Sequence, residues 1–148
     1  MSTDMTQEDM ATQGACMNLQ VLRASHFVLK AFDEAYREFG VRATQLPVLA
    51  MMADYRGPIS IKDVADAVES ERSVMFRKLK VMEKNGWISE DLAASGKEKM
   101  FILTDAGREL IEQLAPVRTR VQEKLMTRLA PDEQYLLMSL CGKLRGLE

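Results

Sequence analysis

The chain has 148 residues, of which 47% are hydrophobic and 28% charged, and its formal net charge is −2 at pH 7. These values are ordinary for a soluble globular protein of one domain, and no apolar run approaches the length of about 18 residues that a transmembrane helix needs. A slightly acidic chain gives no global sign of nucleic-acid binding, so any such function must rest on local charge.

Residues 1–16 are predicted to form a flexible tail and residues 17–148 a single domain. The stretch MSTDMTQEDMATQGA is polar and acidic and lacks the basic and apolar regions of a signal peptide, so a cytoplasmic protein is expected. Two cysteines, Cys16 and Cys141, are too few for a disulfide framework. With one histidine and no close cluster of cysteine and histidine, neither a metal site nor a cofactor is expected.

A long amphipathic helix is predicted over residues 17–39, and Gly40 is a natural stop for it. One face of this helix carries residues at three- and four-residue spacing: Leu22, Ser25, Leu29, Phe32, Tyr36 and Phe39. A second helix is predicted over about residues 43–55, where Pro47 is tolerated because it lies close to the first turn.

Two short helices joined by a tight turn are predicted after a Gly-Pro break. Residues 59–61 suit a very short strand, and Ser60 can cap a helix over about residues 61–69. After a polar turn, a further helix covers about residues 72–85 and ends before Gly86, where a left-handed residue is expected.

A β-hairpin is predicted next, with one strand starting at Trp87 and the other ending at Leu103, joined by a turn at residues 94–97. Two short helices followed by a hairpin form the pattern of a winged helix-turn-helix. The expected fold is therefore mainly α with a small β-hairpin wing, and its DNA-binding lobe covers residues 43–104.

Two further helices follow the hairpin. Thr104 opens a long helix over about residues 105–129, which Pro116 is expected to kink. Pro131 starts a last helix. The side of this helix that is predicted to be buried consists of Leu136, Leu137, Leu140 and Leu144.

Amphipathic helices at both ends of the chain, over residues 17–40 and 105–148, predict a homodimer. Such helices bury more apolar surface when two chains pair, and a palindromic DNA site needs a two-fold protein. The alternative is that these end helices close the core of a monomer.

The stretch ERSVMFRKLKVMEKNGW at residues 71–87 gathers five cations in an acidic chain. On a helix, one stripe is apolar and points inward: Met75, Leu79 and Met82. A second stripe aligns a hydroxyl with three cations: Ser73, Arg77, Lys80 and Lys84. Such a row suits the major groove of DNA, where early residues reach base edges and later cations neutralise phosphates. A basic helix face alone is usually solvated surface, but the preceding helix and the following hairpin favour DNA binding.

Arg77 is expected to pair with guanine or clamp a phosphate, because a guanidinium forms bidentate hydrogen bonds. Phe76 lies between the two stripes, where it meets a thymine methyl group or packs at the rim. Lys78 lies off the basic stripe and is expected to contribute little. The complete set predicted to contact double-stranded DNA is Ser60, Lys62, Arg72, Ser73, Phe76, Arg77, Lys80, Lys84, Lys97 and Lys99.

From about residue 17 to 147 the sequence resembles the MarR family of bacterial transcription regulators. The match is carried by Pro58, Ala65, Ser73, Arg77, Gly86, Leu103, Thr104, Gly107, Pro116 and the Leu-Ala-Pro-Asp-Glu stretch at residues 129–133. The resemblance implies a homodimeric winged helix-turn-helix protein joined through its N- and C-terminal helices. It also implies a repressor that binds a palindromic operator and is released by a ligand.

The wing departs from the family pattern, which usually carries an Asp and an Arg two residues apart. Ser95 stands at the Asp position and Lys97 at the Arg position, while Ser89 and Glu90 occupy positions that are often basic in relatives. Lys97 and Lys99 still reach phosphates, so the wing is expected to bind DNA more weakly than in a typical relative.

The resemblance also implies a small aromatic or anionic effector, bound between the dimerisation helices and the DNA-binding lobe. The candidate ligand residues are Ser25, His26, Met51 and Arg118. For Ser25, a hydrogen-bonded core serine is the alternative. Redox control through Cys16 is a further alternative, although the reactive cysteine of peroxide-sensing relatives corresponds to Asn18.

The sequence offers no nucleophile–base set and no phosphate-binding loop, so an enzyme is not expected. The rival to a DNA-binding regulator is a helical protein-interaction adaptor that uses its wing for protein contacts. Four acidic residues near the turn and the wing keep this rival open: Glu69, Glu71, Glu90 and Asp91.

Overall fold

The computed structural model describes residues 16–147, so the tail predicted over residues 1–16 lies outside the described residues apart from Cys16. The elements are α2 (Met17–Tyr36), η1 (Arg37–Phe39), α3 (Leu46–Tyr55), β1 (Ile59–Ser60), α4 (Ile61–Ala67), α5 (Arg72–Lys84), β2 (Ile88–Glu90), β3 (Met100–Leu103), α6 (Asp105–Met126) and α7 (Pro131–Leu144). This confirms the predicted fold class. None of the described helices is long and apolar enough to cross a membrane.

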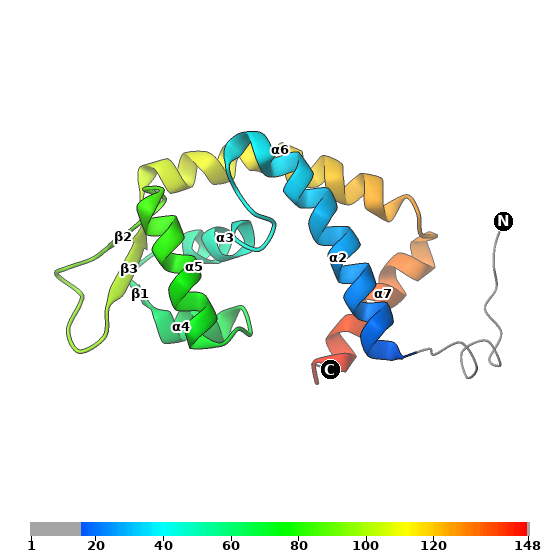
Figure 1. Cartoon of the computed structure of the whole chain (residues 1–148), viewed down its shortest axis with the longest axis horizontal. Helices are drawn as coiled ribbons and strands as arrows, with labels where there is room; N and C mark the ends of the chain where they lie inside the picture. Colours follow the sequence, from blue (N-terminus) through cyan, green and yellow to red (C-terminus); the bar gives the residue numbers. More distant parts are fainter. Residues whose placement is uncertain (1–15, 148) are drawn as a thin grey trace.

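The elements divide into two ends joined by one helix (Figure 1). A lobe formed by α3, α4, α5 and the strands lies at one end, and α2 and α7 lie at the other. Helix α6 runs from the lobe to the far end and packs against α2 on its way. The first half of α6 belongs to the core of the lobe, where Leu110 and Leu114 are buried.

The first predicted helix forms as α2 followed by one 3₁₀ turn, η1, and the chain leaves it at Gly40. Gly40 has φ 69°, a left-handed conformation that glycine adopts without a Cβ penalty. The next helix, α3, begins at Leu46, later than the predicted start near residue 43. The side chain of Gln45 accepts a hydrogen bond from the backbone N–H of Arg42 (2.8 Å) and so holds a turn before α3.

The sheet has three strands in the order β1–β3–β2, so the predicted hairpin gains β1 as a third strand. Both pairings are antiparallel, with Ile59 opposite Phe101 and Ile88 opposite Leu103. These four side chains are buried in the core of the lobe. Because β1 leads directly into α4, its pairing with β3 sets the position of α4 relative to the wing.

Helices α4 and α5 pack against each other through the residues that the sequence predicts to face inward. Met75, Leu79 and Met82 are buried in a core that includes Val64 and Ala65. Each fully buried side chain of this kind stabilises the fold by about 1.5–3 kcal/mol relative to an exposed one. The small side chain of Ala65 lets the two helices approach closely, as the sequence suggests.

Helix α6 starts from a cap that also ties it to the turn between α5 and β2. Thr104 Oγ1 accepts a hydrogen bond from the Gly107 N–H (3.1 Å) and donates one to the Gly86 carbonyl (2.6 Å). Leu114 is fully buried in the core. Pro116 lies inside the helix, where its ring nitrogen donates no hydrogen bond to the preceding turn. The kink expected there stays a prediction.

The prediction that α7 buries a leucine face is wrong for a single chain. Leu136, Leu137, Leu140 and Leu144 are 52%, 45%, 46% and 64% exposed. None of the residues of α7, all of which the structure describes, is buried. The reason is that α7 lies beyond the core of the lobe, at the far end of α6 (Figure 1).

Candidate nucleic-acid interface

The outward face of α5 carries the basic stripe that the sequence predicts. The stripe consists of Ser73, Arg77, Lys80 and Lys84, and all four residues are exposed. Helical periodicity places them opposite the buried Met75 and Met82. Since the apolar side of α5 holds the helix in the lobe, its basic side is available to a partner without any change in the core.

A hollow of about 230 Å³ lies between the start of α5, the start of α4 and the wing. Its lining consists of Ile61, Lys62, Arg72, Phe76, Glu98 and Lys99. The structure therefore brings together four predicted DNA contacts from three separate segments. Three of them are cations; Lys62 and Lys99 pair with carboxylates nearby, Glu98 adds a carboxylate to the lining, and Arg72 has no ion pair among the described residues.

Several of the predicted cations are held by carboxylates of the lobe. Lys62, Lys80 and Lys99 lie 2.9, 3.4 and 4.0 Å from carboxylate oxygens of Asp66, Glu83 and Glu90. The hydrogen bond to Asp66 raises the pKa of Lys62. Exposed pairs of this kind contribute little to stability, so these lysines can exchange a carboxylate for a phosphate. Arg72, Arg77, Lys84 and Lys97 form no ion pair with any residue between 16 and 147.

Ser60 is not part of the exposed surface, in contrast to its predicted contact with DNA. Its side chain is 2% exposed, and its hydroxyl accepts the N–H of Asp63 (3.1 Å) and donates to the Asp63 carboxylate (2.9 Å). The prediction that Ser60 caps α4 is therefore confirmed, and a capping hydroxyl has no free position toward DNA. The other predicted contacts are all exposed, and their role stays a prediction.

Lys78 has a structural role that the sequence analysis missed. Its side chain is half-buried, and its Nζ donates a hydrogen bond to the Thr44 carbonyl (3.2 Å). Burial lowers the pKa of this ammonium group. The bond links α5 to the turn before α3 and so helps to orient the helix. In the sequence, the partial burial of Lys78 was indicated by its position three residues after Met75, on the flank of the inward stripe.

The wing loop between β2 and β3 is organised by two of its own side chains, Asp91 and Ser95. The Asp91 carboxylate accepts the backbone N–H groups of Ala93 and Ala94 (3.1 and 3.2 Å). Ser95 Oγ accepts a backbone N–H from the start of β3 (2.9 Å). These bonds brace the loop without an Asp–Arg pair, and they leave Lys97 exposed on it.

A second cavity, of about 300 Å³, lies between α2, the start of α3 and α6. Its lining consists of Val28, Leu29, Phe32, Tyr36, Ala43, Leu46, Pro47, Arg118 and Gln122. Burial raises the pKa of Tyr36, and the charge of Arg118 opposes that rise. The phenol is therefore protonated at neutral pH. A mostly apolar wall with one cation and a few polar groups fits a small organic anion.

The structure does not bring the four predicted ligand residues together. Arg118 lines this cavity, but Ser25 is exposed on α2, so it is not a core serine either. Met51 is partly buried against the hydrophobic core. His26 lines a different hollow along α2. Of the four predicted ligand residues, only Arg118 lines this cavity, and its role in ligand binding stays a prediction.

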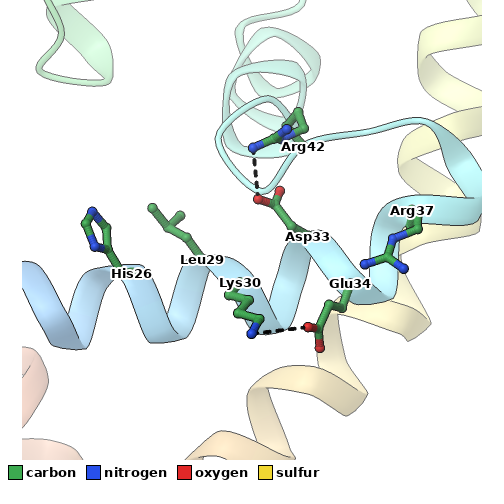
Figure 2. A pocket seen from close by; sticks show the side chains of 7 residues that line it. All are labelled: His26, Leu29, Lys30, Asp33, Glu34, Arg37 and Arg42. Atoms are coloured by element: carbon green, nitrogen blue, oxygen red, sulfur yellow. Dashed lines mark ion pairs between the residues drawn. The ribbon is translucent and has the colours of Figure 1, made fainter.

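Figure 2 shows the hollow that contains His26, where the charged side chains pair with one another. Lys30 lies 3.9 Å from Glu34, and Arg42 lies 3.2 Å from Asp33. Asp33 also accepts the backbone N–H of Ala43 (2.7 Å). The two contacts of Asp33 link α2 to the turn before α3, whereas the Lys30–Glu34 pair lies within α2.

Both cysteines are exposed free thiols, one near each end of the described sequence. Cys16 directly precedes α2, and Cys141 lies within α7. Within residues 16–147, no group of three His, Cys, Asp or Glu side chains is placed to hold a metal ion. Redox control through Cys16 stays a prediction.

Comparison with known proteins gives two relatives in Bacillus subtilis (strain 168), although no family model matches the sequence. The uncharacterized HTH-type transcriptional regulator YwoH is 23% identical over 107 residues, which cover 72% of this chain and 77% of YwoH. The uncharacterized HTH-type transcriptional regulator YdgJ is 24% identical over 108 residues, which cover 72% of this chain and 65% of YdgJ.

Solved structures with the same fold include two DNA complexes. Bordetella bronchiseptica BpsR, whose DNA binding is regulated by 6-hydroxynicotinic acid, matches with a TM-score of 0.78 at 19% identity, over 87% of this chain and 93% of BpsR. A mutant E. coli MarR bound to operator DNA matches with a TM-score of 0.78 at 16% identity, over 94% and 98% of the two chains. The S. aureus MepR–DNA complex matches with a TM-score of 0.77 at 18% identity, over 87% and 96%.

Proposed function

We propose that this chain, which has the winged helix-turn-helix fold of MarR-family regulators, is a sequence-specific DNA-binding regulator of transcription. The main observation in favour is the exposed stripe on α5 from Ser73 to Lys84, beside a hollow that gathers cations from α4, α5 and the wing. The two relatives are named as transcription regulators rather than as enzymes. A protein with this role acts in the cytoplasm, on the bacterial chromosome.

Helix α5 enters the major groove in this proposal. Arg77 is the main base-reading residue, because its guanidinium has no ion-pair partner among the described residues and can pair bidentately with guanine. Ser73 reaches a phosphate or a base beside it, and Lys84 neutralises a phosphate near the end of the helix. Lys97 and Lys99 of the wing add phosphate contacts.

The regulator acts as a homodimer on a palindromic operator. The exposed leucines of α7 are matched by an exposed apolar surface on the first half of α2: Met17, Leu19, Val21, Leu22, Phe27 and Val28. Pairing of two chains buries both surfaces, and two-fold symmetry places the two α5 helices about one DNA turn, roughly 34 Å, apart. Occupation of the operator by the dimer represses transcription, which is the default among MarR-family regulators.

A small aromatic or other organic anion releases the dimer from DNA. The cavity between α2, α3 and α6 suits such a ligand, with Arg118 to pair with its carboxylate and an apolar wall for its ring. The regulation of BpsR by 6-hydroxynicotinic acid supports this class of effector. Because the cavity adjoins both the lobe and the dimerisation helices, an occupant can change the spacing of the two α5 helices.

The test is the binding of the wild-type chain and of Arg77→Ala to a DNA sequence selected from a random pool. Arg77→Ala is expected to weaken specific binding by about 30-fold or more, because the dimer loses one bidentate base contact, worth about 1–3 kcal/mol, in each half-site. Arg120→Ala is the matched control, since it removes the same charge from an exposed position of α6 and is expected to bind normally. Fluorescence anisotropy over a salt series measures the affinities.

The salt series also distinguishes a DNA-binding regulator from a protein-interaction adaptor. The affinity of a DNA-binding dimer falls steeply as salt rises, because cations on the protein displace ions condensed on the phosphates. Unchanged binding of Arg77→Ala would show that α5 is not the recognition helix. A wild-type chain that selects no DNA would favour the protein-interaction adaptor.

A further inference from the structure

Phe76 is an exposed aromatic residue on α5 that the core of the lobe does not explain. Its side chain is 43% exposed, and it lies outside the buried cluster that contains Met75 and Leu79. A single exposed apolar residue is ordinary on a protein surface. What distinguishes Phe76 is its surroundings on the face proposed to meet DNA.

Cations from three segments line the same hollow as the ring of Phe76, together with the carboxylate of Glu98. These cations are Lys62 of α4, Arg72 of α5 and Lys99 of the wing. On the other side, Lys80 Nζ lies 5.6 Å from the centre of the ring. Lys80 in turn pairs with Glu83 at 3.4 Å. The attraction between the ammonium and the ring restrains the phenyl group before any ligand arrives, which lowers the entropy cost of binding.

An apolar residue among cations fits one strand of a DNA duplex, whose phosphates meet the cations while a base edge meets the ring. A phenyl ring has no hydrogen-bond donor or acceptor, so it cannot read the polar groups of a base. The apolar group on a base edge in the major groove is the C5-methyl of thymine. A phenyl ring in the groove therefore distinguishes bases through this methyl group.

We propose that Phe76 is a specificity-determining residue that selects thymine at one position in each half of the operator, by contact with the thymine methyl group. This assignment rests on the proposed function and deepens it. Arg77 and Phe76 then read different base edges from adjacent positions on α5, one through hydrogen bonds and the other through apolar contact.

The test replaces single thymines of the selected operator by deoxyuridine, which lacks only the methyl group. For the wild-type dimer, replacement of one symmetric pair of thymines is expected to weaken binding by about tenfold, because one methyl group per half-site loses its contact. The other thymines are expected to tolerate the replacement. Fluorescence anisotropy at fixed salt measures each affinity.

Two variants assign the effect to the ring. Phe76→Ala is expected to bind the thymine and deoxyuridine operators equally, with an affinity near that of the wild type for the deoxyuridine operator. Val74→Ala is the matched control, since Val74 is 40% exposed on α5 but lies about 200° away around the helix. It is expected to keep the tenfold difference. Both positions are exposed, so both variants should fold, which thermal unfolding checks.

The outcomes separate this assignment from the function on which it rests. If the wild type responds equally to thymine and deoxyuridine at every position, while Arg77→Ala still loses binding, the assignment of Phe76 is wrong and the DNA-binding function stands. A difference that survives in Phe76→Ala also overturns the assignment, because another residue then contacts the methyl group. A chain that selects no DNA overturns both.

Discussion

Gly107 lies where the first turn of α6 passes close to the backbone before β2. A Cβ added at Gly107 would lie 2.2 Å from the Trp87 carbonyl oxygen and 2.7 Å from Cδ1 of Leu103. The same carbonyl accepts the N–H of Thr104 (3.0 Å), so the backbone at Trp87 cannot move aside without straining a hydrogen bond. The close approach therefore requires glycine at position 107. Gly107 is one of the residues that carry the resemblance to the MarR family, and this contact gives its physical reason.

Gly107→Ala is expected to lower the free energy of unfolding by about 1–3 kcal/mol, because an added methyl group overpacks this contact. Gly142→Ala is the control, since the nearest atom to an added Cβ in α7 lies at 3.8 Å. Alanine favours a helix over glycine by about 1 kcal/mol, so Gly142→Ala should raise stability. Urea unfolding measures both changes, and the same sign in both variants would contradict the packing argument.

At the scale of elements, the sequence best predicts the structural features that depend on residues close to one another along the chain. The cap at Ser60, the inward stripe of α5 and the left-handed glycines at 40 and 86 each involve residues within one or two turns. The pairing of β1 with β3 and the bond from Lys78 to Thr44 join residues far apart in sequence. Local spacing contains no information on such contacts, so they were missed.

The candidate site also combines features that local spacing predicts with features that depend on tertiary packing. Arg77 and its stripe follow from helical periodicity, but the hollow around Phe76 depends on how the wing folds back toward α4 and α5. The predicted ligand residues come from α2, α3 and α6, whereas only one of them, Arg118, lines the cavity between these helices. Helical spacing predicts which residues share one face of a helix, but it does not predict which other elements lie beside that face.

The end of α7 contacts the turn between α4 and α5 through one ion pair. Arg145 donates hydrogen bonds from Nε (2.8 Å) and Nη2 to the carboxylate of Glu69. Glu69 has φ 53°, a left-handed conformation that is uncommon outside glycine. The hydrogen bond from Arg145 lowers the pKa of Glu69, so the pair forms at neutral pH and is lost as acid protonates the carboxylate.

Arg145→Gln is expected to increase hydrogen exchange at residues 68–71 and to change overall stability little, because exposed pairs contribute little to global unfolding. Lys143→Gln removes a cation from the same end of α7, where it pairs with no described carboxylate, and should leave this exchange unchanged. Hydrogen exchange read by mass spectrometry measures the effect. An equal response in both variants would mean that general charge, not the pair, holds the turn.

At the scale of the whole molecule, the two ends of the chain differ in how complete their cores are. The lobe buries Val64, Met75, Leu79 and Phe101 to 2% exposure or less. At the far end, where Figure 1 places α2 and α7, apolar residues of both helices are exposed to solvent in the single chain. A monomer that used its end helices to close its own core would not show this difference, so the exposed surfaces favour the homodimer.

Leu140→Glu is expected to convert the proposed dimer to a monomer, because a carboxylate at the centre of the α7 apolar surface would be buried without a partner on pairing. Leu92→Glu is the matched control, since Leu92 is 78% exposed in the wing loop and far from the end helices. Sedimentation velocity measures the mass of each variant. A Leu140→Glu chain that remains dimeric would place the interface elsewhere.

The same variant links assembly to DNA binding. A dimer engages two half-sites at once, and the second contact forms at a high effective concentration, so overall affinity exceeds that of one lobe by roughly 10²–10⁴. Monomeric Leu140→Glu is therefore expected to lose affinity for the full operator by a factor in that range, yet to bind an isolated half-site as weakly as the wild type does. Equal loss on both DNAs would instead indicate damage to the lobe, which the exchange protection of α5 would reveal.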